Sequence, residues 1–338
     1  MKIVLDAMGS DKYPNPELEG AIMAARNFGI QVILTGDQAM LEPRLRELNK
    51  ENLPITIEHA PDIVEMVDHA VESARQKPNN SMAVGLELVK QGKADAFVTA
   101  GNTGAAMFNA LRKLGRIKGV QRPGLGGTIP TKTGHAILID LGANVDCRPE
   151  YLLQFAIMGS IYAQKMLKVD KPRVGLVSNG EEPGKGNQLV KDTYTLLENS
   201  HLNFIGNVEG KEIFGGHTDV AVTDGFIGNV LLKSSEAVAK LFTEMLKEEL
   251  TASLRTKIGA ALAMPAFKKL RKMLDPSETG AAPLLGINGL VFVGHGRSDA
   301  KAMMNALKVA KQAVEIDLMS ALCEAIQQQL AESTPTAQ

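Results

Sequence analysis

Short apolar runs that end in Gly or Asp recur along this chain and alternate with helical stretches. Their near-continuous Val, Ile and Leu content is typical of strands buried on both faces. The alternation predicts the α/β class, with a mostly parallel, doubly wound sheet. The predicted strands are Lys2–Met8, Gln31–Gly36, Ile55–Ala60, Ala96–Gly101, His135–Asp140, Arg173–Gly180, Asp219–Gly225 and Leu290–Gly296. The predicted helices are Pro16–Gly29, Ser81–Gln91, Asn187–Asn199 and Ser298–Leu330.

One segment departs from this alternation. From Ser234 to Leu274 there is no strand signal, only two helical patterns with a break expected near Pro265. We interpret residues 234–275 as a helical hairpin inserted into a single α/β domain of residues 1–332. Residues 333–338 are expected to form a flexible tail.

Charge and cysteine content restrict the classes of function. The chain has 37 Lys plus Arg against 38 Asp plus Glu, so a net charge of −1 predicts no nucleic-acid partner. Cys147 and Cys323 fall in no metal or redox spacing, which favours a reducing cytoplasm. The first residues do not resemble a signal peptide, and no apolar stretch is long enough to span a bilayer. We expect a cytoplasmic protein that at most lies on a membrane surface.

Five predicted strands end in loops rich in Gly and small polar residues. Glycine lets the backbone approach a ligand closely, and the start of a helix offers free N–H groups to an anion. In open parallel sheets, ligands bind beyond the carboxyl ends of the strands. The loops therefore predict a polar, phosphate-bearing ligand at one sheet edge. They are Asp6–Asp11, Ala100–Gly104, Asp140–Asn144, Ser178–Glu182 and Asp224–Asn229.

The common nucleotide and metal motifs do not account for these loops. Gly184-Lys185-Gly186-Asn187 puts a cation between glycines, but it lacks the spacing of a nucleotide P-loop. No GxGxxG opens a helix after the first strand, and neither HExxH nor CxxC occurs. The sequence therefore predicts neither a dinucleotide cofactor nor a metal site.

Four sequence blocks stand out along the chain. They are DAMGSD at the start, SNGEE followed by GKG, DGFIGNVLLK at Asp224–Lys233 and APLLGINGLVFVGHG at Ala282–Gly296. In order and at family spacing, from Met1 to about residue 325, these blocks resemble the phosphate acyltransferases of phospholipid synthesis. The resemblance implies that acyl carrier protein donates a long-chain fatty acyl group to inorganic phosphate, without a cofactor, and that the acyl phosphate serves glycerol-3-phosphate acylation by a downstream acyltransferase. The resemblance also implies a homodimer and a fold related to phosphotransacetylase and isopropylmalate dehydrogenase.

The chain departs from the family pattern at three places. Ser10 stands where Gly is usual, and Gly280-Ala281-Ala282 replaces Gly-Gly-Ala. Arg297 stands where a small residue is common. The first two changes are small, whereas Arg297 is expected to alter the rim of the pocket and its affinity for phosphate.

The implied reaction assigns roles to particular side chains. A phosphate oxygen attacks the thioester carbonyl, so the site must hold a dianion and stabilise an oxyanion. Lysines would balance the phosphate charge, amide and hydroxyl groups would donate hydrogen bonds, and a histidine would protonate the leaving thiolate or bind phosphate. Asp224 would orient one of these partners. The predicted catalytic residues are Lys185, Asp224, Asn229 and His295. The predicted substrate-binding residues are Asp6, Gly9, Asn102, Thr103, Asn179, Gly180 and Lys233.

Each of these residues also has a purely structural interpretation. Asp6 and Asp140 could cap the helices that follow them, and Asn229 could cap its own helix. Lys233 could extend along a helix surface into solvent. Glu181 and its neighbour Glu182 form a solvated pair more readily than a catalytic one.

The basic run in the hairpin has three possible interpretations. An ordinary charged helix face is the common outcome. The alternatives are contact with acidic acyl carrier protein or with anionic lipid, where apolar residues near the break would insert into the bilayer. We favour helices that form the dimer contact and a hairpin tip that touches the inner face of the cell membrane. The predicted partner or membrane residues are Arg255, Lys257, Leu262, Phe267, Lys268, Lys269, Arg271 and Lys272.

Three rival functions remain open from the residues alone. A phosphotransacetylase or phosphotransbutyrylase would run the same chemistry on acyl-coenzyme A. A metal- and NAD-dependent hydroxyacid dehydrogenase would need a carboxylate cluster, which the sequence does not reveal. A non-catalytic scaffold would gather acyl carrier protein at the membrane and make no use of the five polar loops.

Overall fold

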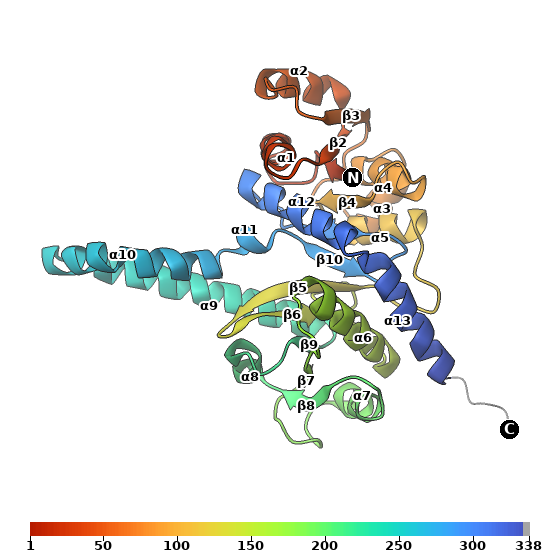
Figure 1. The fold of residues 1–338 in the computed structure, drawn as a ribbon, viewed down its shortest axis with the longest axis vertical. Coiled ribbons are helices and arrows are strands. Elements are labelled where there is room, and N and C mark those ends of the chain that lie inside the picture. The colour runs from red at the N-terminus through yellow and green to blue at the C-terminus, as the bar shows by residue number, and fades with distance from the viewer. Residues whose placement is uncertain (334–338) are drawn as a thin grey trace.

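The computed structural model describes residues 1–333; for Arg271, Lys272, Pro276 and residues 330–333 it describes the backbone alone. Eleven strands form one sheet in the order β3-β2-β1-β4-β11-β10-β5-β6-β9-β7-β8 (Figure 1). The strands are β1 (Lys2–Asp6), β2 (Gln31–Gly36), β3 (Ile55–His59), β4 (Ala96–Thr99), β5 (Gly124–Thr131), β6 (Gly134–Ile139), β7 (Val174–Val177), β8 (Phe204–Val208), β9 (Val220–Val222), β10 (Ala282–Leu285) and β11 (Val291–Val293).

Helices cover both faces of this sheet. They are α1 (Asn15–Phe28), α2 (Gln38–Leu48), α3 (Ala70–Gln76), α4 (Ser81–Lys90), α5 (Thr103–Lys113), α6 (Pro149–Met166), α7 (Gln188–Glu198), α8 (Gly210–Gly215), α9 (Gly225–Thr251), α10 (Leu254–Leu274), α11 (Pro276–Thr279), α12 (Ala300–Glu315) and α13 (Leu318–Ser333). Within β1, Ile3 and Leu5 pack into one hydrophobic layer, whereas Val4 packs into the other. Because alternate residues of a strand point to opposite faces, this split shows a sheet buried on both sides. The predicted α/β class and doubly wound sheet are confirmed.

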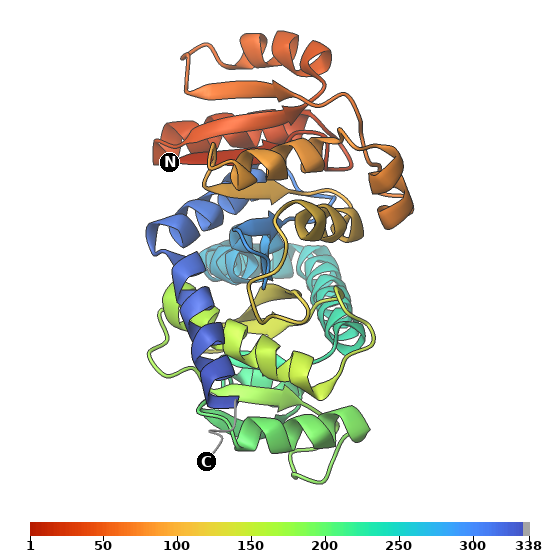
Figure 2. The same ribbon diagram turned by 90° about the vertical axis from the view of Figure 1, so that its right-hand side faces the viewer.

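The sheet consists of two parallel blocks that run in opposite directions. β3, β2, β1, β4 and β11 are parallel to one another, and so are β6, β9, β7 and β8. Between the blocks, β10 is antiparallel to β11 and β5, and β5 is antiparallel to β6. Three antiparallel pairings in succession therefore reverse the direction of the second block. Figure 2 shows the two blocks one above the other.

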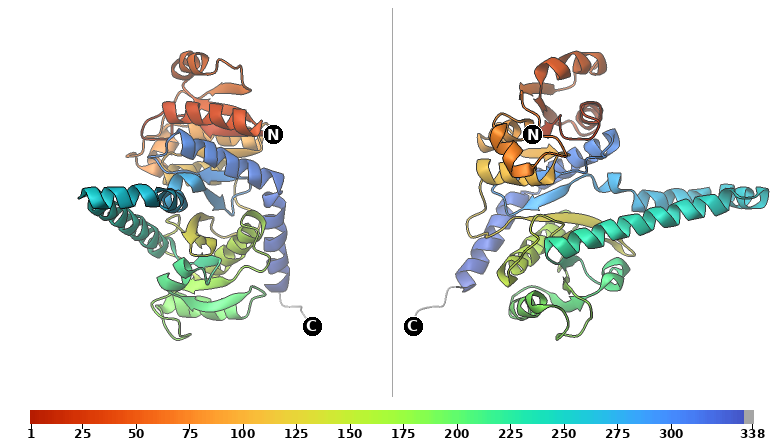
Figure 3. Two further views of the ribbon diagram at one scale, coloured as in Figure 1. Left: turned by 60° about the vertical axis from the view of Figure 1, so that its left-hand side comes forward. Right: turned by 180° about the vertical axis from the view of Figure 1, so that it is seen from behind.

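Two helices extend away from the body of the molecule. α9 and α10 lie antiparallel to each other and project to one side (Figures 1 and 3). The turn between them lies at Ala252 and Ser253, and Pro265 lies inside α10. The expected break near Pro265 is therefore wrong. The oxygen of Ser253 accepts a hydrogen bond from the backbone N–H of Thr256, and this N-cap begins the second helix.

Other boundaries also differ from the sequence prediction. The long helix predicted at Ser298–Leu330 is two helices, because Asp317 adopts a positive φ of 50° between α12 and α13. The predicted tail begins at Ser333, the last residue of α13, and residues 334–338 lie outside the described residues. The division into one domain of residues 1–332 stays a prediction. Among the described helices, none combines the length and the apolar character needed to cross a membrane.

Candidate active site

The loop after β1 is built around a buried carboxylate. Asp6 is fully buried and accepts hydrogen bonds from Thr99 Oγ1 at 2.7 Å and from the Met8 N–H at 3.0 Å. Gly9 approaches the next loop so closely that a Cβ there would lie 2.7 Å from the Gly101 nitrogen. Burial raises the pKa of Asp6, and its hydrogen bonds partly offset that rise. Asp6 therefore caps no helix; it joins the ends of β1 and β4.

A second buried carboxylate, which the sequence analysis missed, lies under the same loop. Glu17 in α1 is fully buried, and its Oε1 accepts a hydrogen bond from the Ser10 N–H at 2.9 Å. Among the described residues, no hydrogen bond reaches its Oε2 or the Ser10 hydroxyl. Burial raises the pKa of Glu17 to about 7. Ser10, one of the departures from the family pattern, therefore places a hydroxyl in a tightly enclosed polar site.

The start of α5 uses Asn102 as a structural clamp. Its Oδ1 accepts a hydrogen bond from the Ala105 N–H, and its Nδ2 donates to the backbone oxygens of Met66 and Asp68, both at 3.2 Å. The amide of Asn102 is therefore engaged by the chain itself, whereas Thr103 beside it is partly exposed.

The loop after β6 wraps around the carboxylate of Asp140. This buried group accepts hydrogen bonds from four backbone N–H groups and from Asn144 Nδ2, which lies 2.8 Å from Oδ2. Burial raises the pKa of Asp140, and the five donors oppose that rise. Asp140 therefore organises a loop and caps no helix. The backbone donors belong to Leu125, Gly142, Ala143 and Asn144.

The start of α9 packs against this loop. Asp224 is the N-cap of α9, because its Oδ1 accepts a hydrogen bond from the Ile227 N–H at 2.9 Å. Gly228 lies so close to the loop that a Cβ there would lie 1.8 Å from the backbone oxygen of Asp140. Asn229 is exposed in the first turn of α9. A Cβ at Gly142 would lie 3.7 Å from the Cβ of Asn229. Asn229 is therefore free of the capping role, which Asp224 fills.

Two turns further along α9, a lysine meets the end of β11. Lys233 Nζ lies 3.2 Å from His295 Nε2. Arg297 forms an ion pair with Glu236 at 3.1 Å, and Glu236 lies 4.0 Å from Lys233. Of these four residues, the sequence analysis assigned no role to Glu236, although its i,i+3 spacing from Lys233 on a helix is a recognisable signal. Together they form a half-exposed charged cluster, which we call the Lys233–His295 cluster.

The protonation of His295 follows from its neighbours. Partial burial lowers the pKa of this imidazole, and the Arg297 and Lys233 cations lower it further. The ring is therefore uncharged at neutral pH. Because a lysine ammonium can only donate, Nε2 is the acceptor and the ring proton sits on Nδ1. The backbone nitrogen of Arg297 lies 3.5 Å from Nδ1, farther than the lysine lies from Nε2. We therefore assign the tautomer from the shorter lysine contact.

The loop after β7 is open to solvent. Asn179 Oδ1 accepts a hydrogen bond from the Gly186 N–H at 2.9 Å. A Cβ at Gly180 would lie 2.8 Å from Lys185 Cγ, so the lysine stem runs along this glycine. Lys185 is exposed, and no carboxylate pairs with it within residues 1–333. Among the described residues, no hydrogen bond or ion pair joins it to the Lys233–His295 cluster.

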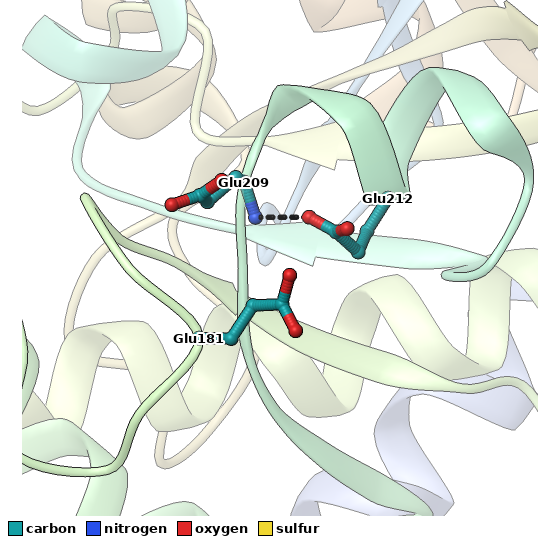
Figure 4. A group of neighbouring side chains, drawn as sticks. All are labelled: Glu181, Glu209 and Glu212. Carbon is teal, nitrogen blue, oxygen red and sulfur yellow. Dashed lines mark hydrogen bonds between the residues drawn. The ribbon is translucent and has the colours of Figure 1, made fainter.

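A carboxylate group next to this loop has the arrangement of a metal site. Glu181, Glu209 and Glu212 bring one oxygen each within 4.8 Å of one another (Figure 4). Lys211 Nζ already lies 2.6 Å from Glu181, 3.4 Å from Glu209 and 3.7 Å from Glu212. This one ammonium group contacts all three carboxylates, of which Glu181 is exposed and the other two are partly buried, so their grouping has an explanation without a metal ion.

The sequence predicts that the five polar loops lie at one sheet edge. This prediction is wrong. Two of the loops follow β1 and β4, and three follow β6, β7 and β9, which run in the opposite direction. The parallel-sheet rule fails here because the chain crosses three antiparallel pairings between the blocks. α9 connects the groups, since it begins at the β6 and β9 loops and brings Lys233 to His295 after β11.

In the hairpin, the predicted partner residues lie along α10. Leu254, Ile258 and Leu262 share one helix face and are 74%, 56% and 80% exposed. Arg255, Lys257, Lys268 and Lys269 are exposed, and Phe267 is partly exposed. The side chains of Arg271 and Lys272 lie outside the described residues. Leu262 lies in the middle of α10, because the hairpin turns at residues 252–253.

The fold resembles those of a phosphotransacetylase and a phosphotransacylase of known structure. A phosphotransacetylase from Staphylococcus aureus superposes with a TM-score of 0.56 at 17% identity, over 97% of this chain and 94% of its own. A branched-chain phosphotransacylase from Enterococcus faecalis gives 0.58 at 15% identity, over 93% of this chain and 99% of its own. At such low identity these likenesses concern the fold alone. They confirm the predicted relation to the phosphotransacetylase fold.

Sequence comparison is more specific. Acidobacterium capsulatum has a protein named phosphate acyltransferase that is 50% identical over 92% of both chains. One of the same name from Pelotomaculum thermopropionicum is 46% identical over 97% of this chain and 95% of its own. The model of the family described as fatty acid synthesis protein matches residues 1–321. Because this family model matches nearly the whole chain and both relatives are at least 46% identical to it, the chain belongs to the fatty acid synthesis protein family.

Proposed function

We propose that this protein is a phosphate acyltransferase that moves a long-chain fatty acyl group from acyl carrier protein to inorganic phosphate. The acyl phosphate would serve the acylation of glycerol-3-phosphate in phospholipid synthesis. The supporting observation is the Lys233–His295 cluster, a cation and a neutral imidazole 3.2 Å apart, in a chain 50% identical to a phosphate acyltransferase. The resemblance implies no cofactor, and the chemistry below uses none.

The cluster fits the electrostatics of this reaction. Lys233 and Arg297 would attract the phosphate dianion, and a phosphate oxygen would attack the thioester carbonyl. His295 would take the phosphate proton as the C–O bond forms and return it to sulfur as the C–S bond breaks. An uncharged imidazole with a lowered pKa suits the first of these transfers. Asn229 would hydrogen-bond the oxyanion from the first turn of α9.

The loop after β7 would supply a second cation. Lys185 is exposed and has no carboxylate partner among the described residues, so its ammonium group is available to a phosphate. Its stem lies along Gly180, and Asn179 fixes the loop through Gly186. We assign Lys185 the neutralisation of charge on phosphate or on the developing oxyanion. Asp6 and Gly9 would act through the shape of their loop, because Asp6 is fully buried.

The hairpin would join two copies of the chain and bring them to the membrane. α9 exposes Val238, Leu241, Phe242 and Met245, each more than half exposed, and a second copy would cover this stripe. On α10, Leu254, Ile258 and Leu262 would enter the headgroup region beside basic residues. We therefore propose a cytoplasmic homodimer that lies against the inner face of the cell membrane, near the acyltransferase that uses its product.

An assay of the purified protein with palmitoyl-acyl carrier protein and inorganic phosphate tests the reaction. We expect release of the carrier thiol only when phosphate is present, with acyl phosphate as product, and much slower turnover of palmitoyl-coenzyme A. Lys233→Met and His295→Ala should each lower kcat/KM by about 100-fold or more, whereas Lys50→Met on the far surface should not. Faster turnover of short acyl-coenzyme A thioesters would favour the rival phosphotransacylase. No turnover of either donor would favour the scaffold.

Binding to anionic liposomes tests the membrane contact separately. We expect the purified protein to sediment with vesicles that contain phosphatidylglycerol, and Leu262→Glu to reduce this binding. Ala260→Glu, on the opposite side of α10 from Leu254 and Leu262, is the matched control for added charge. Absence of binding by the unmodified protein would remove the membrane contact from the proposal.

A further inference from the structure

A groove with no assigned role lies between the segment that follows α5 and the first turn of α6. It consists of two adjoining cavities of 430 and 670 Å³. Both are lined by Leu111, Arg116, Gly119 and Val120, and the larger one extends to Tyr151. The two cavities therefore form one continuous hollow on the surface.

The segment beside this groove is strongly and uniformly basic. Residues 111–123 include five Lys or Arg and no Asp or Glu. Lys113 forms an ion pair with Glu87 at 3.1 Å; within the described residues, the other four are exposed and have no carboxylate partner. The opposite side of the groove has no such excess of positive charge, because Arg148, the N-cap of α6, is followed by Glu150. Excess positive charge therefore gathers on one side of the groove. The four cations are Arg112, Arg116, Lys118 and Arg122.

The segment is held in place by contacts that leave two of these cations free. Gln154 of α6 accepts from the Gln121 N–H at 2.8 Å and donates to the Gly119 oxygen at 2.9 Å. The guanidinium of Arg116 donates to the Gln121 oxygen. Among the described residues, the exposed side chains of Arg112 and Lys118 make no hydrogen bond or ion pair, so their charges face solvent on a fixed backbone. Fixed surface charges steer and orient a charged partner.

One residue connects this groove with the candidate active site. Asn144 Nδ2 donates to the Pro123 oxygen at 2.7 Å, at the end of the basic segment. The Asn144 oxygen accepts from the Gly225 N–H at 2.7 Å, at the start of α9. The groove therefore opens beside the loop that packs against Asn229. A protein bound in the groove would therefore lie next to the candidate active site.

We propose that the basic segment at residues 112–122 is the surface that docks the acidic acyl carrier protein. This inference rests on the proposed function and gives it an interaction surface. A protein partner is favoured over a membrane because the surface is concave and, among the described residues, no strongly exposed large apolar side chain falls within 111–123. The cations of α10, by contrast, lie on helices that project away from the body (Figure 3).

Charge reversal at the two free cations tests this surface. We expect Arg112→Glu combined with Lys118→Glu to raise KM for palmitoyl-acyl carrier protein about 10-fold or more at low salt. The value of kcat, KM for phosphate and turnover of decanoyl-N-acetylcysteamine, a thioester without a carrier, should stay within about twofold. The matched control is Lys268→Glu with Lys269→Glu, which makes the same change of charge on α10. An unchanged melting temperature would show that both variants fold.

Direct binding separates this inference from the proposed reaction. Fluorescence anisotropy of labelled acyl carrier protein should show binding that salt weakens and that the Arg112 and Lys118 reversal abolishes. If the unmodified protein binds in this way but transfers no acyl group to phosphate, the reaction fails and the docking surface stands. An equal effect of the α10 reversal, or no effect at residues 112 and 118, would overturn the docking surface. Loss of liposome binding by the 112 and 118 reversal with carrier binding intact would overturn it in favour of a membrane.

Discussion

Two glycine-rich loops look alike in the sequence and differ in the structure. The loop at Asp6–Ser10 is buried throughout, and fully buried carboxylates at Asp6 and Glu17 hold it from below. The loop at Asn179–Gly186 is largely exposed and is held by the contact of Asn179 with Gly186. Both follow strands and both belong to family blocks. The first therefore contributes to the stability of the fold, and the second mainly presents Lys185.

The difference shows that membership in a family motif does not tell whether a residue stabilises the fold or takes part in binding and catalysis. A buried polar network stabilises only when its members are satisfied, so changes there affect the free energy of unfolding first. Changes in an exposed loop affect binding and rate first. Four experiments test this division, in order of their expected effect on the free energy of unfolding.

Glu17→Gln should have the largest effect, and it should depend on pH. The pKa of Glu17 is raised from 4.5 to about 7 in the folded protein, so its contribution to stability is full below pH 4.5 and is lost as the pH rises through 7. The uncharged glutamine escapes this loss and can also donate to the unpartnered Ser10 hydroxyl. We expect the variant to gain about 3 kcal/mol at pH 8 and nothing near pH 4.5. Urea unfolding at both pH values measures it, and an equal change at both would contradict the assignment.

Gly9→Ala should destabilise the protein by about 2 to 3 kcal/mol, because its Cβ would meet the backbone nitrogen of Gly101 at 2.7 Å. Gly184→Ala in the exposed loop meets nothing within 4 Å and should change stability by less than about 0.5 kcal/mol. Urea unfolding of the two variants gives the comparison directly. Similar losses in both would remove the distinction between the loops.

Thr99→Val should cost about 2 kcal/mol. Its hydroxyl donates to Asp6 Oδ2 at 2.7 Å and accepts from the Gly101 N–H at 2.9 Å, and valine removes this donor from the buried carboxylate and this acceptor from the buried N–H. Asn179→Ala removes one exposed hydrogen bond at 2.9 Å and should cost about 0.5 kcal/mol. Thermal unfolding measured by circular dichroism can rank the pair. A larger loss for Asn179→Ala would reverse the interpretation.

Lys185→Ala should have almost no effect on stability and a large effect on activity. The side chain is exposed and pairs with no described carboxylate, so the melting temperature should stay within about 1 °C. If Lys185 contacts phosphate, kcat/KM should fall by about 100-fold, with a smaller loss in Lys185→Arg, which keeps the charge. Unchanged kcat/KM in Lys185→Ala would exclude a role at the site.

The sequence predicts eight of the eleven described strands and misses β8, β10 and, most instructively, β5. This segment, Gly124–Thr131, contains three glycines and a proline, which disfavour a strand when considered locally. It forms a strand because β6 and β10 flank it, and because its glycines admit neighbouring side chains. A Cβ at Gly127 would lie 2.3 Å from Leu141 Cδ1. Missing β5 hides the reversal of direction between the two blocks.

The candidate site is predictable in its residue types and only partly in its geometry. The sequence analysis singled out Lys233 and His295, and these residues meet. It did not find Glu17, whose position in an amphipathic helix looks like an ordinary charged residue. Nor did it predict that Asp140 organises a loop, because the five donors come from Leu125 and from the loop itself. Contacts between distant parts of a chain leave no local pattern.

The pairing of β10 and β11 near the end of the chain has a consequence for protein synthesis. β4 receives its second neighbour only when Val291–Val293 has been made, and β5 is joined to the first block only through Ala282–Leu285. While the ribosome translates the intervening segment of roughly 150 residues, both strands present open edges to other chains. The nascent polypeptide is therefore most exposed to edge-to-edge association just before the hairpin and β10 emerge. Translation that pauses within α9 or α10 would prolong that state.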